Sequence, residues 1–389
     1  MRYYIIAGEA SGDLHGSNLM KGLYSEDSNA EIRFRGGQMM ENVYSGHEAE
    51  GCGKAYDYRE GAVMGLMEVL AKAGSLLRNM SDCKKDILRF NPDVIILIDY
   101  PGFNLRIAEW AHRKGFKVFY YIAPKVWASR EGRIKNLKRD VDRLFIVFPF
   151  EKSYFESKGV PYVYCGNPLV DAVDHSTAMS QSHDDFCSAN ALEPGTRYFA
   201  MLAGSRLNEV STMMPLLKET AAILHSKPEF SDYKFIIAGA PGRCEADYGE
   251  YDRSYIKVIF GQTQSIVHSA EAAAINSGTA SLEAVLLGTP QVVAYRIKSR
   301  ITYYIAKYFL LKSKYISLGN LCLNRLAFKE FYRIEDCTAE NVAAELERLV
   351  ADKEYRAAML DDYAAIRSSL GGSGASRAVA KAMIDLLQK

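Results

Sequence analysis

Residues 3–16 have the sequence YYIIAGEASGDLHG, in which an apolar run leads into a glycine-containing turn and then into a segment of helical pattern. A strand, a turn and a helix in this order are typical of an α/β fold, and free backbone N–H groups at such a turn can bind an anion. The spacing is not GxGxxG, and Glu9 would repel a pyrophosphate, so a dinucleotide site is not predicted. Glu9, Ser11 and Asp13 follow the carboxyl end of the strand, which favours a substrate-facing loop. Plain turn chemistry of the glycines is the alternative.

The alternation of apolar runs and helix-length segments continues through the first half of the chain. Strands are predicted at residues 3–7, 31–35, 94–98, 118–122, 144–148 and 162–165. Helices are predicted between them at residues 13–24, 66–90, 105–114 and 151–158. This alternation predicts a mostly parallel sheet with helices on both faces.

A second series of strands follows a break in the pattern. Residues 173–195 are rich in Ser, His, Asp and Ala and have no apolar period, so we predict a linker. The later strands are predicted at residues 198–202, 234–238, 256–260, 272–275 and 291–295. The predicted fold class is therefore α/β, with two Rossmann-like domains at 1–172 and 196–345 facing across a cleft. Helices in 346–389 are expected to pack back on the first domain.

Composition limits the classes of function. A chain of 389 residues is long enough for two domains, and its net charge of +1 gives no overall field for nucleic acid. The seven cysteines form no CxxC, which indicates reduced thiols in a cytosolic protein. No run of roughly 18 apolar residues is present, so any contact with a membrane is expected to be peripheral.

Asp99 directly follows the apolar run 94–98, at the mouth of a predicted buried strand. A carboxylate in this place, with a raised pKa, can act as a general base toward an acceptor hydroxyl. The alternative is that Asp99 caps a helix beginning near Gly102 or Phe103.

Two segments of the second half predict a nucleotide-sugar site. Arg206 follows the strand at 198–202 and could hold a diphosphate, while Asn208 could be an N-cap. Residues 276–283, NSGTASLE, place small residues at a helix N-terminus, where a phosphate can approach the backbone, and Glu283 one turn later could bind ribose hydroxyls. The small residues are Ser277, Gly278, Thr279, Ala280 and Ser281, of which Ser277 or Thr279 could be only an N-cap.

Neither a DxD pair nor a histidine–carboxylate cluster occurs where the cleft is predicted, so no divalent metal is expected. Arg206 and a helix N-terminus would then stabilise the charge of the leaving group.

Two further stretches have the composition of a lipid-facing surface. Residues 63–77 are mostly apolar, and residues 296–316 interleave lysine and arginine with aromatic side chains. Such a mixture suits an anionic membrane interface, although core helices use the same residues. The candidate acyl-chain or membrane residues are Val63, Met64, Leu66, Met67, Tyr303, Tyr304 and Tyr308.

In identity and order, the motifs resemble those of the lipid-A-disaccharide synthases. The matching segments are GEASGD at 8–13, IDYPGFN at 98–104, APKVWAS at 123–129, GNPLVD at 166–171, GSRLNEV at 204–210, NSGTASLEAVLLGTPQVVAYR at 276–296 and YISLGNL at 315–321. The likeness extends from the first strand to about residue 340.

The resemblance implies a GT-B fold and an inverting, metal-independent glycosyltransferase without a cofactor. Its reaction would move 2,3-diacylglucosamine from the UDP derivative to the 6-hydroxyl of 2,3-diacylglucosamine 1-phosphate, giving the β-1,6-linked lipid A disaccharide and UDP. The first domain would take the acceptor and the second the UDP-sugar. The implied roles are base for Asp99, acceptor side for Glu9 and Ser11, diphosphate for Arg206, nucleotide for Gly278 to Ser281 and Glu283, and donor positioning for Asn320.

The same resemblance implies a cytoplasmic protein, peripheral on the inner face of the inner membrane, with an anionic lipid surface as a partner. No nucleic acid is expected as a partner, because the net charge is only +1. Whether the protein forms a homodimer is left open by the sequence. The sequence departs from the family pattern, and these departures leave a different acyl or acceptor preference open. They include Tyr100, Lys125, Asn167 and Ala203, where the family has Ala, Ser, His and Pro.

Two alternatives compete with this interpretation. Another GT-B enzyme acting on a UDP-sugar, such as a cell-wall precursor transferase or an epimerase, would share the second-half segment but not GEASGD. A non-catalytic UDP-sugar- or lipid-binding protein could use the same scaffold, because a fold does not imply a function. Asp99 and Arg206 argue against such a loss of activity.

Overall fold

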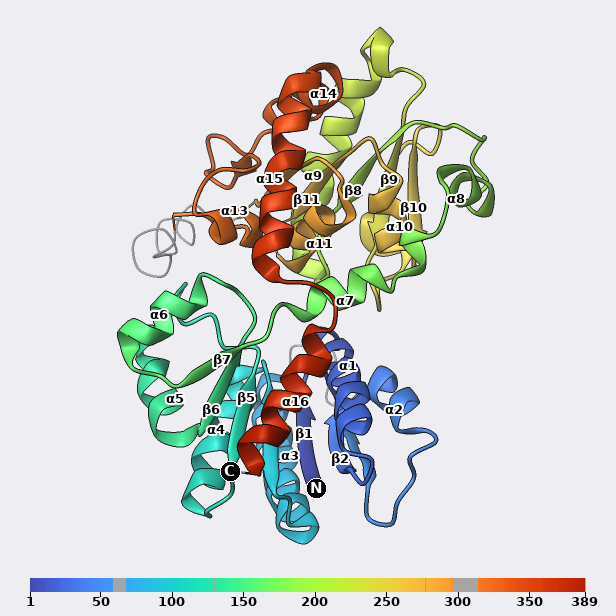
Figure 1. Ribbon diagram of the computed structural model, residues 1–389. Helices are drawn as coiled ribbons and strands as arrows, with labels where there is room; N and C mark the ends of the chain where they lie inside the picture. Colours follow the sequence, from blue (N-terminus) through green and yellow to red (C-terminus); the bar gives the residue numbers. More distant parts are fainter. Residues whose placement is uncertain (59–67, 129, 277, 297–313, 389) are drawn as a thin grey trace. The chain divides into compact units, whose positions relative to one another are not determined.

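The computed structural model describes residues 1–58, 68–128, 130–276, 278–296 and 314–388. The chain forms two compact units (Figure 1). Unit 1 contains Met1–Pro168 together with Gly371–Lys389, and unit 2 contains Leu169–Leu370. Unit 1 is therefore built from both ends of the chain.

Unit 1 has a seven-stranded parallel sheet. Its strands are β1 (Arg2–Ala7), β2 (Glu31–Gly36), β3 (Gly53–Asp57), β4 (Val94–Ile98), β5 (Val118–Tyr121), β6 (Arg143–Ile146) and β7 (Tyr162–Tyr164). The strand order is β3-β2-β1-β4-β5-β6-β7, so the direction of winding reverses between β1 and β4. Ligands of open α/β sheets bind outside the carboxyl ends of the strands at such a reversal.

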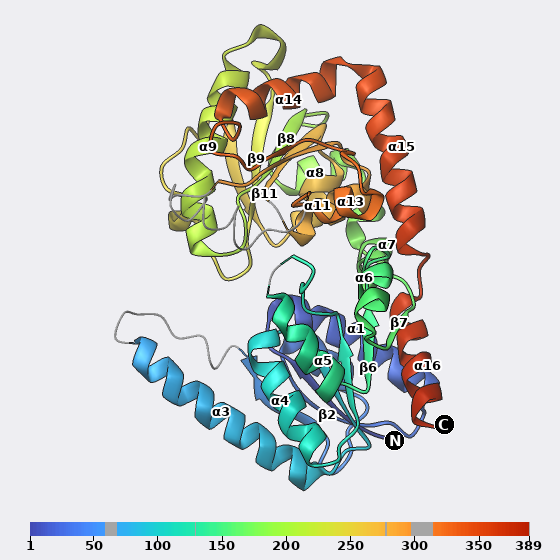
Figure 2. The same cartoon turned by 90° about the vertical axis from the view of Figure 1, so that its left-hand side faces the viewer.

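Helices cover the sheet of unit 1 and supply most of its remaining core. They are α1 (Ala10–Glu26), α2 (Gln38–Tyr44), α3 (Glu68–Phe90), α4 (Pro101–Arg113), α5 (Ile134–Asp140), α6 (Glu151–Lys158) and α16 (Ala375–Leu387). The C-terminal α16 packs along α1, although the two helices are about 350 residues apart in the sequence (Figures 1 and 2). The last helix of the chain is therefore a part of the N-terminal fold.

Unit 2 has a six-stranded parallel sheet. Its strands are β8 (Tyr198–Leu202), β9 (Lys234–Gly239), β10 (Ile256–Phe260), β11 (Ala272–Asn276), β12 (Gln291–Ala294) and β13 (Glu330–Phe331). The order β10-β9-β8-β11-β12-β13 reverses between β8 and β11, as the sheet of unit 1 does between β1 and β4. The loops that follow β8 and β11 therefore meet at a second switch point.

Eight helices among the described residues accompany the sheet of unit 2. They are α7 (Pro168–Asp174, beginning at the last residue of unit 1), α8 (His183–Ala189), α9 (Leu207–His225), α10 (Thr263–His268), α11 (Thr279–Leu287), α13 (Leu318–Leu323), α14 (Ala339–Ala351) and α15 (Lys353–Leu370). Helix α14 packs against α9 and α15.

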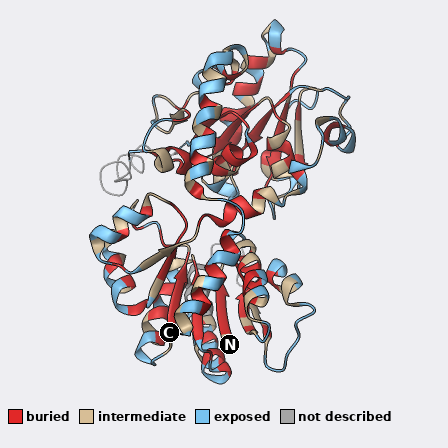
Figure 3. Ribbon diagram, viewed as in Figure 1, coloured by how far each residue is buried: buried red, intermediate tan, exposed pale blue. Residues whose placement is uncertain are grey.

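The strands are apolar because both faces of each sheet are covered. All five residues of β4 and of β8 are buried, and so is β11 (Figure 3). Strands covered by helices on both faces are near-continuous apolar runs, which is why the sequence predicts them well. Strands β3 and β13 lie at sheet edges and are partly exposed, and the apolar pattern did not predict them.

The segment 173–195 was predicted as a linker but contains ordered structure. Helix α8 lies within it, and its residues Phe186 and Cys187 are fully buried. The division between units falls at Pro168 rather than at 173–195. Of the C-terminal helices, only α16 belongs to unit 1, whereas α14 and α15 belong to unit 2.

Among the described residues, no helix is both long enough and apolar enough to cross a membrane.

Candidate active site

The loops after β1 and β4 interlock at the switch point of unit 1. A Cβ atom at Gly8 would overlap the ring of Tyr100, so a glycine is required where the two loops touch. Tyr100 directly follows Asp99, and Glu9 directly follows Gly8. The contact therefore brings the GEASGD and IDYPGFN motifs together, with Glu9 near enough to Asp99 to influence its charge.

Asp99 and Tyr100 both adopt left-handed backbone conformations. Their φ angles are 42° and 47°, and Tyr100 also precedes Pro101, which disfavours helical backbone angles. For a residue other than glycine this region costs roughly 1–2 kcal/mol. Strain of this kind persists where the surrounding structure enforces it, and it is frequent at active sites.

The pKa of the Asp99 carboxyl is raised above its ordinary value. Burial is the main cause and the negative charge of Glu9 adds to it, while Lys125 and the backbone N–H of Tyr100 act in the opposite direction. A carboxylate with a raised pKa is a better proton acceptor than an exposed aspartate. The capping alternative is not supported, because Tyr100 occupies the N-cap of α4 and this helix has no side-chain cap.

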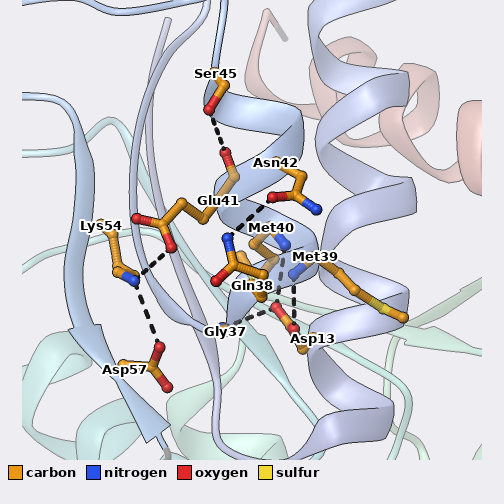
Figure 4. Close-up of polar contacts among 10 residues, drawn as sticks. All are labelled: Asp13, Gly37, Gln38, Met39, Met40, Glu41, Asn42, Ser45, Lys54 and Asp57. Atoms are coloured by element: carbon orange, nitrogen blue, oxygen red, sulfur yellow. Dashed lines mark hydrogen bonds and ion pairs between the residues drawn. The ribbon is translucent and has the colours of Figure 1, made fainter.

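Asp13, the last residue of GEASGD, has a structural role. Its buried carboxylate accepts hydrogen bonds from the backbone N–H groups of Gly37, Met39 and Met40, at 2.8, 3.0 and 3.1 Å (Figure 4). These groups belong to the N-cap and first turn of α2, where backbone donors have no partner within the helix. Asp13 therefore fixes α2 to α1, which leaves Glu9 and Ser11 as the exposed polar side chains of this loop.

The loops after β8 and β11 meet in unit 2. Gly204 has a φ of 106°, and a Cβ there would overlap Asn276 of β11 and Glu209 of α9. The Glu209 carboxylate accepts the backbone N–H groups of Ser205 and Arg206, and it pairs with the Arg206 guanidinium at 3.1 Å. Arg206 is itself the N-cap residue of α9, so the alternative that Asn208 caps this helix is wrong.

Arg206 presents most of its guanidinium to solvent. Its side chain is 71% exposed, and the single ion pair to Glu209 uses only part of its five N–H donors. The remaining donors can bind two oxygens of a phosphate in the fork geometry of arginine.

The N-terminus of α11 is built from small residues. Gly278 is the N-cap residue, with a φ of 144° and no side-chain cap, and the Ser281 hydroxyl donates to its carbonyl at 2.8 Å. Thr279 is exposed and Ala280 is half-buried, so little side-chain volume covers these backbone N–H groups. One turn later, Glu283 accepts a hydrogen bond from Gln264, and burial raises the pKa of its carboxyl.

Asn320 is fully buried, and both ends of its side-chain amide are hydrogen-bonded to other protein groups. Its Nδ2 donates to the Phe328 carbonyl and to Glu330, at 2.9 and 2.8 Å, and its Oδ1 accepts from the N–H groups of Ala327 and Phe328. The structure therefore gives Asn320 a supporting role within residues 315–330. The role of Asn320 in positioning the donor, which the resemblance implies, stays a prediction.

Four side chains at the carboxyl edge of the unit 1 sheet were not assigned a role from the sequence. Lys125 affects the charge of Asp99, and the side chains of Asn104 and Tyr120 contact its backbone. Glu151 is buried, accepts the Trp127 indole N–H at 3.1 Å, and has a pKa raised to about 7 by burial. Each lies in or just beyond a strand or helix end at the same sheet edge, a position that could have suggested it.

Several candidates lie outside the described residues. They are Val63, Met64, Leu66, Met67, Ser277, Tyr303, Tyr304 and Tyr308. In the described part of the chain, no three histidine, cysteine or acidic side chains are grouped so that they could hold a metal ion.

Two parallel α/β sheets, each with a switch point in its strand order, give the chain the GT-B fold. The fold is similar to that of the UDP-GlcNAc 2-epimerase from Neisseria meningitidis bound to UDP-GlcNAc, with a TM-score of 0.65 at 14% identity over 99% of this chain and 100% of that one. It is also similar to CalG4, the calicheamicin glycosyltransferase, with a TM-score of 0.58 at 11% identity over 100% and 98% of the two chains.

The chain belongs to the lipid-A-disaccharide synthase family. Residues 3–382 match the family model of lipid-A-disaccharide synthetase. The lipid-A-disaccharide synthase of Geobacter metallireducens is 36% identical over 391 residues, covering 100% of this chain and 98% of the relative. That of Nitrosococcus oceani is 32% identical, covering 99% and 96%. The chain is thus a glycosyltransferase that forms the lipid A disaccharide.

Proposed function

We propose that this enzyme transfers 2,3-diacylglucosamine from its UDP derivative to 2,3-diacylglucosamine 1-phosphate, with inversion and without a metal ion. Asp99 is the general base in this proposal. The observation that carries it is the Asp99 carboxylate at the switch point of unit 1, with a pKa raised by burial and by Glu9. Glu9 and Ser11, which are exposed on the adjoining loop, line the acceptor side.

The proposed chemistry is a single displacement at the anomeric carbon of the donor. Asp99 takes the proton of the acceptor 6-hydroxyl as the oxygen forms a bond to that carbon, and the bond from the carbon to the diphosphate oxygen breaks on the opposite face. The β linkage forms and UDP leaves as the anion. One base and one stabilised leaving group are sufficient for this reaction.

Unit 2 holds the nucleotide in this proposal. The remaining donors of Arg206 and the backbone N–H groups of Gly278 to Ala280 bind the diphosphate, since both provide positive charge at the same switch point. Ser281 is buried and its N–H donates to the Gly278 carbonyl, so Ser281 supports this turn. Glu283 binds the ribose hydroxyls in this proposal. Asn320 acts indirectly, by holding residues 315–330 in place.

We further propose that the enzyme is cytoplasmic and works on the inner face of the inner membrane, on an anionic surface. Both substrates of the proposed reaction carry acyl chains, so the enzyme must meet them at a lipid interface. Helix α3 supports this: Leu77 and Leu88 are 64% and 51% exposed. Between residues 76 and 90, the exposed charged residues of this helix are Arg78, Lys85, Arg89 and Asp82. Three of the four are basic, which suits an anionic surface.

The reaction is tested by measuring UDP release from UDP-2,3-diacylglucosamine in detergent with EDTA, with and without the acceptor. Release that requires the acceptor and survives EDTA is expected. Release that stops in EDTA and returns with a divalent ion would overturn the metal-free mechanism. UDP binding without any release would overturn the proposed donor and acceptor pair.

Asp99→Asn is expected to lower turnover by about 100-fold or more, because general-base catalysis typically contributes 10²–10⁴-fold. Folding raises the pKa of Asp99, so the ionised carboxylate lowers stability at neutral pH, and the variant should unfold at an equal or higher temperature. Asn tolerates the left-handed backbone as well as Asp does. Unchanged turnover in a folded variant would remove Asp99 from the role of base.

Arg206→Ala is expected to weaken UDP binding by about 10-fold or more, because charge-assisted hydrogen bonds contribute roughly 1.5–3 kcal/mol. Arg197→Ala is the matched control, since Arg197 also pairs with a glutamate but lies just before β8, at the other end of the same strand. Titration of each variant with UDP gives the comparison. Equal affinity in Arg206→Ala and the parent would exclude Arg206 from the diphosphate site.

A further inference from the structure

The backbone carbonyl of Asp99 accepts two hydrogen bonds from buried side chains. Asn104 Nδ2 donates to it at 2.8 Å, and the Tyr120 hydroxyl donates to it at 2.5 Å. Both side chains are completely buried, and they come from different elements, α4 and β5. Two separate elements therefore converge on one oxygen atom.

The other side of the Asp99 peptide is also fixed. Its N–H donates to the carbonyl of Tyr121 at 3.0 Å, which continues the β4–β5 ladder by one residue. The amide and the carbonyl together determine φ and ψ, and these angles determine the direction of the Cα–Cβ bond. The direction in which the carboxylate leaves the chain is thus set by Tyr121 on one side and by Asn104 and Tyr120 on the other.

The conformation held in this way is one that the chain would not adopt readily by itself. Asp99 and Tyr100 are consecutive left-handed residues before a proline, and Ile122 at the end of the neighbouring β5 is left-handed as well, with a φ of 62°. An extended continuation of β4 would rotate the Asp99 carbonyl and the Cα–Cβ bond away from their present directions. The hydrogen bonds from Asn104 and Tyr120 oppose that change.

Tyr120 is suited to act only as a donor. Burial raises the pKa of its hydroxyl far above the ordinary value, so the proton stays on the oxygen at neutral pH. Asn104 Nδ2 also donates to the carbonyl of Ile98 at 3.1 Å, which fixes the last residue of β4 together with Asp99.

We propose that Tyr120 and Asn104 are positioning residues that hold the Asp99 carboxylate in the direction required for catalysis. The proposal rests on the role of Asp99 as the general base. A purely structural role would instead make the two residues contribute to stability and leave turnover per folded enzyme unchanged. The two roles predict different kinetics.

The first experiment compares Tyr120→Phe with the parent in full-length enzyme. The ring is retained and only the hydroxyl is lost, so the fully buried site keeps its packing. We expect kcat to fall by about 10-fold or more, since small misplacement of a reacting group can cost up to about 10²-fold. KM for the acceptor and the affinity for UDP should stay within about 2-fold, because neither depends on the direction of the base.

Tyr198→Phe is the matched control. Tyr198 is also a fully buried tyrosine whose hydroxyl donates to a backbone carbonyl, that of Ile266, at 2.8 Å. It lies at the first residue of β8, at the end of that strand opposite the switch-point loop. The Tyr198→Phe variant should lose stability as Tyr120→Phe does but keep the kcat of the parent.

The second experiment asks whether the effect passes through Asp99. Tyr120→Phe and Asn104→Ala are each combined with Asp99→Asn, and the residual turnover is measured. If the two residues act by directing the carboxylate, adding either substitution to Asp99→Asn should change turnover by less than about 2-fold, although each lowers it in the parent. Should Asn104→Ala fail to fold, the Tyr120→Phe cycle alone decides.

Failure of the inference is distinguishable from failure of the proposed function. Full turnover in Asp99→Asn would overturn the role of Asp99 itself. A large loss in Asp99→Asn with a parent-like kcat in Tyr120→Phe would overturn the positioning role only. If Tyr120→Phe lowers turnover by the same factor in the parent and in the Asp99→Asn background, its effect is independent of Asp99. That result would also overturn the positioning role.

Discussion

At the scale of single residues, the charge of Asp99 is set by neighbours that act in opposite directions. Burial and Glu9 raise the pKa of its carboxyl, and Lys125 lowers it. Lys125 is exposed, so its effect is reduced by salt, while burial is not. The pH at which the base becomes active is therefore adjustable from two positions without changing Asp99.

Glu9→Gln and Lys125→Met are expected to move the pH dependence of kcat/KM in opposite directions. Turnover is lost as the pH falls through the pKa of Asp99, because the protonated form cannot accept a proton. Removing Glu9 lowers that pKa, so the loss moves to lower pH, and removing Lys125 raises it, so the loss moves to higher pH.

A pH–rate series for the parent and both variants at low and high salt measures these shifts. The shift caused by Lys125→Met should shrink at high salt. Movement of both profiles in the same direction would contradict this electrostatic account.

The sequence showed Glu9 and Asp99 as candidates, but it did not show that they influence each other. The contact between Gly8 and Tyr100 joins segments about 90 residues apart.

At the scale of elements, the short helix α2 depends on a carboxylate from another helix. It has seven residues, and an isolated helix of that length is unstable in water. Its N-cap residue is Gly37, which supplies no side-chain acceptor, and Asp13 of α1 supplies the acceptor instead. A helix cap contributed by a different helix cannot be identified from local sequence rules.

Asp13→Ala is expected to lower the free energy of unfolding by about 1–3 kcal/mol, the range for losing a cap and charge-assisted hydrogen bonds. Asp13→Asn should cost less, since one amide oxygen can still accept from Gly37 and Met40, which both donate to Oδ1. Denaturant unfolding and hydrogen exchange at residues 37–40 measure both effects. The half-buried cap Thr338 of α14 provides the control, and Thr338→Ala should cost about 0.5–1 kcal/mol.

A loss for Asp13→Ala no larger than that for Thr338→Ala would mean that Asp13 is not the principal cap of α2. The same conclusion would follow if Asp13→Ala lost hydrogen-exchange protection in α1 but kept it at residues 37–40.

At the scale of the whole molecule, the chain leaves unit 1 at Pro168 and returns to it at Gly371. Helix α16 then buries Val379, Ala380 and Met383 within unit 1. Its backbone comes so close to α1 that a Cβ at Gly22 would lie 3.0 Å from the Ala380 Cβ and from the Ser376 carbonyl oxygen. Unit 1 is complete only when the end of the chain is in place.

Gly22→Leu is expected to displace α16 and to destabilise the protein by about 1–3 kcal/mol, the usual cost of overpacking. Limited proteolysis should then cleave residues 371–389 sooner than in the parent, while UDP binding by unit 2 stays unchanged. Gly132→Ala is the control, because a Cβ there meets nothing within 4 Å. A C-terminus equally resistant to protease in Gly22→Leu and the parent would contradict this arrangement.

The sequence alone determined the two series of strands, the α/β class and the loops in which Asp99, Arg206 and residues 278–283 lie. These signals are local: an apolar run such as VIILI at 94–98 predicts a buried strand wherever it occurs, and small residues after a strand predict a helix N-terminus open to a phosphate. The family motifs added a reaction to this framework.

Only the tertiary structure decided which partner each polar side chain takes. Asp13 caps α2, and Asn320 forms hydrogen bonds with Phe328 and Glu330. Tyr120 and Asn104 both donate hydrogen bonds to the carbonyl of Asp99. A hydrogen bond depends on distance and angle in space, and most of these partners lie many residues apart in the chain. A residue type that suits both binding and structure is therefore assigned only when its neighbours from other elements are known.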